Sequence, residues 1–166
     1  MTDRPRLARH TTVEACEALL DIGPLLVPEA ADLRDVVRDA ARQSATRLIG
    51  VVDRVGRLVG VIPVTRVAES IVARVVPEAL FIDVEDAATA SEFSHSVEDR
   101  TARDIMLPPA AVARSTTIGE AFRLMHKRGL GGVYIVDDQQ KPTGYLDLLE
   151  LALVYVRLMG ESGEPA

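Results

Sequence analysis

Residues 132–146, GVYIVDDQQKPTGYL, match an earlier stretch of the chain, residues 48–62, LIGVVDRVGRLVGVI. In each stretch an apolar run ends in Val-Asp, a polar loop follows, and a glycine lies at the start of a second apolar run. The aspartate, Asp53 or Asp137, precedes that glycine by seven positions both times. Two short apolar runs around a polar loop are typical of a β-hairpin. The chain therefore contains one structural unit twice.

An amphipathic helix is predicted upstream of each hairpin. Apolar residues recur at i, i+3, i+4 and i+7 within residues 33–41 and again within residues 118–125. This spacing places them on one face of a helix that packs against a core. Asp32 before the first helix, and either threonine of residues 116–117 with Glu120 before the second, are typical of helix N-termini.

Each copy continues with further elements in the same order. A proline-containing segment that can carry a short strand precedes each helix, over residues 22–28 and 105–112. A second helix follows each hairpin, over residues 65–76 and 147–159. The last of these is apolar around most of its circumference, which fits either contact with a partner or a central core helix. The predicted fold class is α+β, with two β-α-β-β-α repeats.

The repeats divide the chain into five segments. The stretch between them is acidic and rich in Ala and Ser, and we interpret it as one or two short helices. The C-terminal residues are polar and contain Gly and Pro, as disordered ends do. The predicted segments are an N-terminal segment (1–17), the first repeat (18–76), a helical bridge (77–100), the second repeat (101–159) and a disordered tail (160–166).

The composition predicts a globular, cytoplasmic protein. Of the 166 residues, 48% are hydrophobic and 27% are charged, which allows a core and an ordinary surface. No run approaches the roughly 18 apolar residues of a membrane span, and residues 1–10 do not resemble a signal peptide. The net charge of −6, with Lys and Arg scattered among acids, argues against nucleic acid as a partner.

The residue types that carry catalysis are isolated in this sequence. Cys16 is the single cysteine, and His10, His95 and His126 lie in different segments without metal-ligand spacing. The sequence contains no phosphate-binding loop, dinucleotide fingerprint or nucleophile elbow. We therefore expect neither an enzyme nor a required cofactor.

Taken together, these features resemble a tandem pair of CBS (cystathionine β-synthase) domains, also called a Bateman module. The resemblance is carried by the Asp-Ile-Met of residues 104–106, the apolar stripe of residues 118–125, the Val-Asp strand ends, and the glycines Gly60 and Gly144. It extends over residues 18–159. It implies two units related by a pseudo-twofold axis, a stand-alone module that forms a homodimer, and a separate effector protein that the module regulates.

The resemblance also implies ligands. Adenosyl compounds such as AMP, ADP, ATP or S-adenosylmethionine commonly bind such modules in the two clefts between the units. In the family, a Ser or Thr that faces phosphate stands three residues after the last-strand glycine, and an Asp that accepts ribose hydroxyls stands three further. The first copy has Pro63 and Arg66 at these positions, and the second has Asp147 and Glu150. Neither copy keeps the family's pattern.

The altered positions predict different chemistry in the two copies. Glu150 can accept ribose hydroxyls, whereas Asp147 would face a phosphate with like charge. Arg66, with Thr65 beside it, can bind phosphate or can lie on the surface at a helix start. Both acids also fit a first helical turn, where the helix dipole stabilises them. The expected ligand-binding residues are Ile49, Pro63, Thr65, Arg66, Val112, Gly132, Val133, Asp147 and Glu150.

Two other functions fit the same sequence. The apolar helix at residues 147–159 fits a dimerisation or docking module whose clefts no longer bind ligand, with Tyr155 and Leu158 in the contact. A divalent-cation sensor is suggested by the acidic CBS pairs of magnesium transporters, because Mg²⁺ prefers carboxylate oxygens. The acids concerned are Asp83, Glu85, Asp86, Asp137, Asp138, Asp147 and Glu150.

Overall fold

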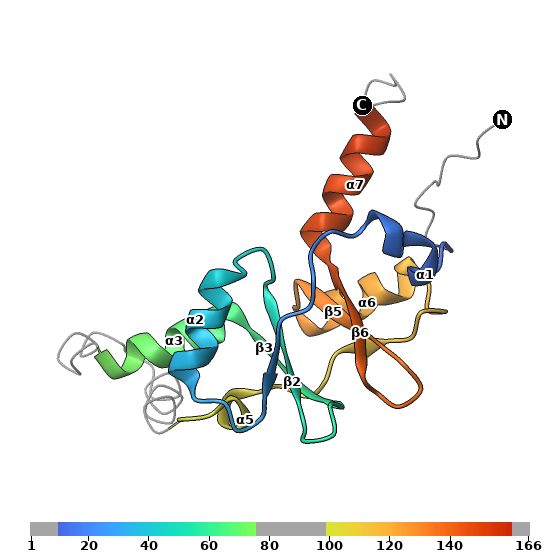
Figure 1. Ribbon diagram of the computed structural model, residues 1–166. Helices are drawn as coiled ribbons and strands as arrows, with labels where there is room; N and C mark the ends of the chain where they lie inside the picture. Colours follow the sequence, from blue (N-terminus) through green and yellow to red (C-terminus); the bar gives the residue numbers. More distant parts are fainter. Residues whose placement is uncertain (1–9, 76–98, 161–166) are drawn as a thin grey trace.

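The computed structural model describes residues 10–75 and 99–160 and contains two three-stranded sheets, each with its own helices (Figure 1). The predicted bridge at residues 77–100, apart from its last two residues, lies outside the described residues. So do residues 1–9 of the predicted N-terminal segment and the predicted tail from residue 161 onward.

The first repeat has the predicted order of strand, helix, strand, strand, helix. Its first strand pairs in parallel with the second, and the second pairs antiparallel with the third, so the hairpin predicted at residues 48–62 is confirmed. The elements are β1 (Leu26–Pro28), α2 (Leu33–Arg42), β2 (Leu48–Val52), β3 (Leu58–Pro63) and α3 (Val64–Val75).

The second repeat has the same order and the same pairing. Its hairpin, predicted at residues 132–146, forms in equivalent register, with a local irregularity at the same place before the turn. The elements are β4 (Ala111–Val112), α6 (Ile118–Arg128), β5 (Gly132–Val136), β6 (Pro142–Asp147) and α7 (Leu148–Gly160). The α+β prediction with two β-α-β-β-α repeats is therefore confirmed.

The predicted N-caps are present in both helices that precede a hairpin. Asp32 accepts a hydrogen bond from the Arg34 amide at 2.8 Å, at the start of α2. At the start of α6, Thr117 and Glu120 form a reciprocal capping box, in which each side chain accepts from the other residue's amide. These bonds satisfy amides that a helix leaves without partners in its first turn.

The segments that precede the two repeats are exchanged between them. Helix α1 (Val13–Cys16), followed by the 3-10 turn η1 (Glu17–Leu19), belongs to the chain before the first repeat but packs on the second (Figure 1). The Val13 amide donates to the Thr116 carbonyl at 2.8 Å, beside the start of α6. Cys16 is buried in α1, where burial raises the pKa of its thiol and keeps it unreactive.

The opposite exchange occurs at the first repeat. Helix α5 (Ala102–Ile105) precedes the second repeat but packs at the start of α2. The Ala102 amide donates to the Ala31 carbonyl at 2.9 Å, and the Leu33 amide donates to the Arg100 carbonyl at 3.0 Å. Each repeat is thus completed by the segment that leads into the other, which ties the two together.

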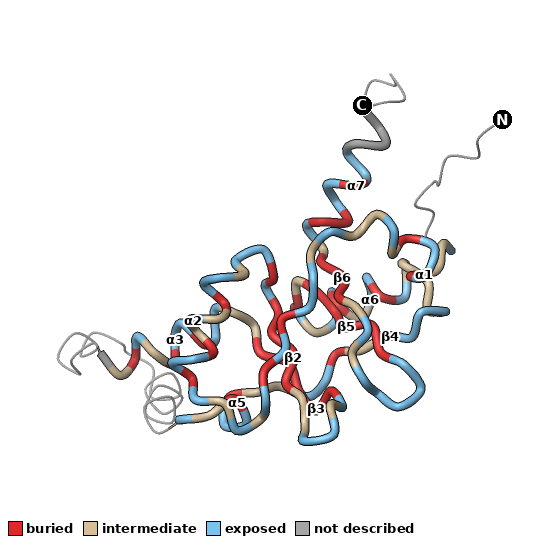
Figure 2. Tube along the Cα trace, in the orientation of Figure 1, coloured by how far each residue is buried: buried red, intermediate tan, exposed pale blue. Residues whose placement is uncertain are grey.

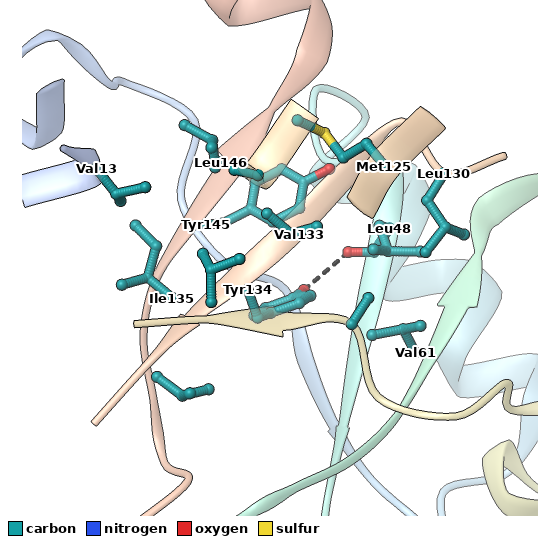
Figure 3. Packing of buried hydrophobic residues seen from close by; sticks show 14 of the residues in the cluster. Val13, Leu48, Val61, Met125, Leu130, Val133, Tyr134, Ile135, Tyr145 and Leu146 are labelled. Carbon is teal, nitrogen blue, oxygen red and sulfur yellow. Dashed lines mark hydrogen bonds between the residues drawn. The ribbon is translucent and has the colours of Figure 1, made fainter. Parts of the chain in front are cut away.

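The cores meet at the seam between the sheets, where buried residues of β2 and β5 lie side by side (Figure 2). Leu48 and Val61 of the first repeat belong to the same buried cluster as Met125, Val133 and Leu146 of the second (Figure 3). A continuous apolar core across the seam holds the two repeats in a fixed relation.

Tyr134 is the largest side chain that crosses the seam. It is fully buried, and its hydroxyl lies 2.8 Å from the carbonyl oxygens of both Leu25 and Leu48 in the first repeat. Figure 3 shows the contact with Leu48. The position equivalent to Tyr134 in the first repeat is Gly50, where an added Cβ would lie 2.8 Å from the Tyr134 ring. The glycine therefore provides the space that the tyrosine fills.

Candidate functional site

The corner where β6 meets α7 contains two of the predicted ligand-binding acids. Asp147 has no solvent exposure and caps α7: its Oδ1 accepts from the amides of Leu149 at 2.9 Å and Glu150 at 3.2 Å. Its Oδ2 accepts from the Tyr145 hydroxyl at 3.0 Å. Burial, together with the charge of Asp147, raises the pKa of Tyr145, so that hydroxyl stays protonated and donates. Asp147 therefore caps α7 from the residue before the helix, whereas the sequence suggested a place within its first turn.

Glu150 lies one turn further along α7 and is only 6% exposed. Its Oε1 accepts from the backbone amides of Asp21 and Ile22, the second at 2.9 Å. Its Oε2 is buried and has no hydrogen-bond partner among the described residues. Leaving a carboxylate oxygen buried and unpaired is costly, so this atom is suited to a hydrogen-bond donor brought by another molecule.

The β6–α7 corner carries uncompensated negative charge. Neither Asp147 nor Glu150 forms an ion pair with a described residue. Both carboxylates are buried, where charges interact more strongly than in water. The corner is therefore suited to hydroxyl donors or cationic groups and is unfavourable for phosphate.

The equivalent corner of the first repeat, where β3 meets α3, has a different character. Pro63 ends β3 and pairs with Leu48, and Thr65 and Arg66 begin α3 with exposed side chains. The Arg66 Nε donates to the Ile105 carbonyl at 2.7 Å. This corner thus presents a guanidinium and a hydroxyl at the surface, a donor set that fits an anion.

The remaining predicted residues lie inside the cores. Ile49 is fully buried in the first repeat, and Val112 and Val133 are buried in the second. Gly132 pairs with Asp147 across the second hairpin, and a side chain there would overlap the ring of Tyr145. The space beside this glycine is therefore filled by a tyrosine of the same sheet.

Two surface cavities are lined by other residues than these. One, of about 350 Å³, is bounded by the ends of β1 and β2 and by α5, and includes the Glu29–Arg103 ion pair. The other, of about 400 Å³, is an apolar groove between α6 and α7. The groove residues are Ile118, Gly119, Phe122, Leu148, Leu151, Ala152 and Tyr155. Neither cavity is lined by any of the nine predicted ligand-binding residues.

The acids of the cation hypothesis are only partly described. Asp83, Glu85 and Asp86 lie outside the described residues, and so does His95. Asp137 serves the second hairpin turn, where its Oδ1 accepts from the amides of Gln139 at 2.8 Å and Lys141 at 2.9 Å. Within residues 10–75 and 99–160 there is no group of three His, Cys, Asp or Glu side chains placed to hold a metal ion.

Two features of the site were not predicted from the sequence. The role of Tyr145 as the donor to Asp147 has a weak signal, because its position in the other repeat is occupied by Val61, and a difference between repeats marks a specialised position. The contact of Glu150 with the amides of Asp21 and Ile22 has no signal, because backbone amides are present at every residue except proline.

Comparisons with known proteins identify the unit and the fold. The family model of the CBS domain matches residues 102–157. A CBS domain-containing protein from Thermotoga maritima has a similar structure, with a TM-score of 0.68, 24% sequence identity, and coverage of 90% of this chain and 97% of that one. No curated protein matches the chain.

Two further structures of similar fold contain ligands. The CBS domain pair of protein MJ0100, in complex with 5′-methylthioadenosine and S-adenosyl-L-methionine, has a TM-score of 0.62 and 17% identity, covering 92% of this chain and 98% of that one. CBSX2 from Arabidopsis thaliana, in complex with AMP, has a TM-score of 0.60 and 18% identity, covering 90% and 98%. In the described part of this chain, no helix has the length and apolar character needed to cross a membrane.

Proposed function

Because the chain carries a CBS domain at residues 102–157 and has the fold of a tandem CBS pair, we propose that it is a regulatory ligand-binding module. In this proposal an adenine nucleotide or related adenosyl metabolite binds between the repeats and biases the activity of a separate protein. The module works in the cytoplasm and catalyses no reaction itself.

The observation that carries the proposal is the Glu150 carboxylate. One of its oxygens is held by backbone amides, while Oε2 is buried without a partner among the described residues. A ribose offers two adjacent hydroxyl donors, for which a carboxylate oxygen is a natural acceptor. The position of Glu150 is also the one at which the family's ribose-binding acid stands.

The charge of the β6–α7 corner narrows the ligand class. Asp147 and Glu150 would repel a phosphate, whereas S-adenosylmethionine, with its sulfonium and amino groups, and 5′-methylthioadenosine, without phosphate, avoid that cost. The solved pair that contains these two compounds supports the choice. If AMP, ADP or ATP binds, we place its phosphate at the β3–α3 corner beside Thr65 and Arg66.

A second candidate function is dimerisation or docking through the groove between α6 and α7. The groove is apolar, and large side chains stand exposed beside it and along α7, which projects from the sheets (Figure 1). We propose a second copy of the chain as the occupant, because the groove and the projecting helix lie on one molecule and can pair reciprocally around a twofold axis. The exposed residues are Phe122, Leu149, Leu153, Tyr155 and Val156.

The ligand proposal is tested by calorimetric titration and by the melting temperature of the purified chain with S-adenosylmethionine, 5′-methylthioadenosine, AMP, ADP and ATP. A ligand at a hundred times its dissociation constant stabilises the folded state by about 2.7 kcal/mol. Glu150→Gln should weaken the phosphate-free ligands at least tenfold, and Asp138→Asn, at an exposed acid of the hairpin turn, should not. Absence of binding by all five compounds at millimolar concentration would refute the ligand proposal.

The dimer candidate is tested separately by sedimentation. Tyr155→Glu should convert a dimer to a monomer, whereas Val55→Glu, at a comparably exposed residue of the first hairpin turn, should leave the dimer intact. A wild-type chain that sediments as a monomer at all concentrations would contradict the dimer and leave the ligand proposal untouched.

A further inference from the structure

The segment that joins η1 to β1 crosses directly from one repeat to the other. We call residues 20–24 the N-terminal strap. At one end Leu20 and Ile22 pack against the core of the second repeat. At the other end the Gly23 carbonyl accepts from Gln43 Nε2 at 3.0 Å and from Thr46 Oγ1 at 2.9 Å, both in the first repeat. The strap is therefore fixed at its two ends by different repeats.

The middle of the strap is held by Glu150. The amides of Asp21 and Ile22 both donate to Oε1 of this α7 side chain. The same carboxylate carries the unpartnered Oε2. One side chain thus joins the strap to the atom at which we place a ligand hydroxyl.

The equivalent segment before β4 is held in the same way but with opposite polarity. Arg66 donates to the Ile105 carbonyl at 2.7 Å, and Arg128 donates to the carbonyls of Pro108 and Pro109, each at 2.6 Å. Arg66 is exposed and Arg128 is half-buried, and neither has a buried atom left without a partner. This segment lacks a vacant acceptor and therefore serves as an internal control for the N-terminal strap.

We propose that the N-terminal strap is the element that reports ligand binding in the second repeat. This inference rests on the proposed function. In this proposal the strap lifts away from α7 to admit a ligand to the buried Oε2, and it closes again once the ligand hydroxyl is bound. A donor at Oε2 fixes the carboxylate in the orientation that accepts from Asp21 and Ile22, so ligand binding and strap docking favour each other.

The strap is joined through η1 to α1, so a change in the position of the strap can alter the docking of α1. Helix α1 is docked on the second repeat through Val13 and Cys16, both buried, and through the bond from the Val13 amide to Thr116. A strap held closed by ligand secures this docking, and a strap released from Glu150 loosens it. The surface that a regulated protein reads is therefore expected to include α1 and the strap.

The proposal is tested by amide hydrogen exchange measured by NMR on the full chain, with 5′-methylthioadenosine and S-adenosylmethionine as probes. Saturation with a probe should slow exchange at Asp21 and Ile22 by about tenfold or more, a usual size for an allosteric coupling. Exchange at Leu107, whose amide donates to the Val61 carbonyl at 2.8 Å in the equivalent segment, should not change.

Two substitutions separate the two oxygens of Glu150. Glu150→Ala removes both, so Asp21 and Ile22 should exchange faster even without a probe. Glu150→Gln keeps one carbonyl oxygen for the strap but puts a donor in place of the vacant acceptor. It should therefore exchange like the wild type without a probe and gain little or no protection with one.

The outcomes distinguish this inference from the proposed function. A probe that binds, as measured by calorimetry, but leaves exchange at Asp21 and Ile22 unchanged would overturn the strap proposal and keep the ligand site. Failure of both probes to bind would overturn the ligand site and the strap proposal together. Protection that survives in Glu150→Gln would also overturn the strap proposal, because the coupling would not pass through Oε2.

Discussion

The β3–α3 and β6–α7 corners occupy equivalent places in the two repeats, yet their side chains have opposite charge. Arg66 is exposed and donates to a carbonyl, whereas Glu150 is buried and accepts from two amides. Each nevertheless holds the backbone segment that leads into the opposite repeat. The comparison shows that a side chain at this position can hold the segment either as a donor or as an acceptor, because each peptide unit offers both a carbonyl and an amide.

The seam shows a second difference between the repeats. The second contributes two aromatic side chains, Tyr134 and Tyr145, where the first has Gly50 and Val61. Tyr134 reaches the backbone of the first repeat through its hydroxyl. The pseudo-twofold relation therefore holds for the backbone but not for the packing across the seam, which depends on one large side chain opposite one glycine.

The largest predicted effect comes from removing that side chain. Tyr134→Ala should lower the free energy of unfolding by about 3–5 kcal/mol, as truncation of a buried aromatic residue does. Tyr134→Phe, which loses only the hydroxyl, should cost about 1–2 kcal/mol. Urea denaturation measures both, and a loss under 1 kcal/mol for Tyr134→Ala would show that the seam does not depend on this ring.

The glycine opposite provides the control for that comparison. Gly50→Ala should destabilise the wild type, because its Cβ would lie 2.8 Å from the Tyr134 ring and 2.7 Å from the flexible Leu26 side chain. In the Tyr134→Ala background the same change should cost clearly less, which gives a measurable coupling energy. Equal costs in the two backgrounds would contradict the proposed pairing of tyrosine and glycine.

Much of the fold could be predicted from the sequence because it depends on local periodicity. The repeat of residues 48–62 in residues 132–146 defined both hairpins, and the stripes that follow Asp32 and Thr117 defined two helices. The exchange of α1 and α5 between the repeats could not be predicted. Their contacts with the opposite repeat include backbone hydrogen bonds, such as that from the Val13 amide to Thr116, which any residue except proline can donate. No side-chain pattern records which repeat such a segment meets.

The candidate site was only partly accessible to the same reasoning. The sequence placed Asp147 and Glu150 at a helix start and offered two roles for them, ligand binding and stabilisation of the first turn. In the structure, Asp147 caps α7, and Glu150 holds the strap through Oε1. The vacant Oε2 and the burial of both acids depend on tertiary packing, which residue spacing does not encode.

The next largest effect should come from the cap at the β6–α7 corner. Asp147→Ala removes acceptors for two amides and for the buried Tyr145 hydroxyl, and should cost about 2 kcal/mol of stability. Pro63→Ala, at the equivalent position of the first repeat, should change stability by less than about 0.5 kcal/mol. Equal effects at the two positions, measured by urea denaturation, would contradict the assigned capping role.

A smaller effect should appear in ligand selectivity. Asp147→Asn keeps an oxygen that can cap α7 but removes a negative charge from the β6–α7 corner. AMP should then bind the β6–α7 corner roughly three- to tenfold more tightly than this corner of the wild type binds it, since a like charge is removed at short range. Because we place the wild-type AMP phosphate at the β3–α3 corner, calorimetric titration should show the change as a second AMP site in the variant, with the first site unaltered. The affinity for uncharged 5′-methylthioadenosine should stay constant. Absence of a second AMP site in the variant would show that the Asp147 charge does not exclude phosphate from this corner.

The smallest predicted effect is acid sensitivity, which distinguishes the two exchanged segments. Asp104 forms a capping box with Thr101 at the start of α5, whereas α1 is capped by Thr12 without an acid. Hydrogen bonds from the amides of Arg100 and Thr101 hold the pKa of Asp104 below its usual range. A carboxyl group whose pKa is lower in the folded state binds fewer protons there than in the unfolded chain, so its contribution to stability is lost as the pH falls.

Between roughly pH 5 and pH 3, the wild type should therefore lose stability more steeply than Asp104→Asn, whose side chain does not titrate. Urea denaturation across this range measures the difference, and Asp138→Asn provides an exposed control. Since Asp104 is itself largely exposed, solvent screens its interactions, and the difference between the two slopes should be small. Exchange of the α5 amides should accelerate on acidification in the wild type more than in Asp104→Asn. Equal acceleration in the two proteins would show that the docking of α5 does not depend on the Asp104 carboxylate.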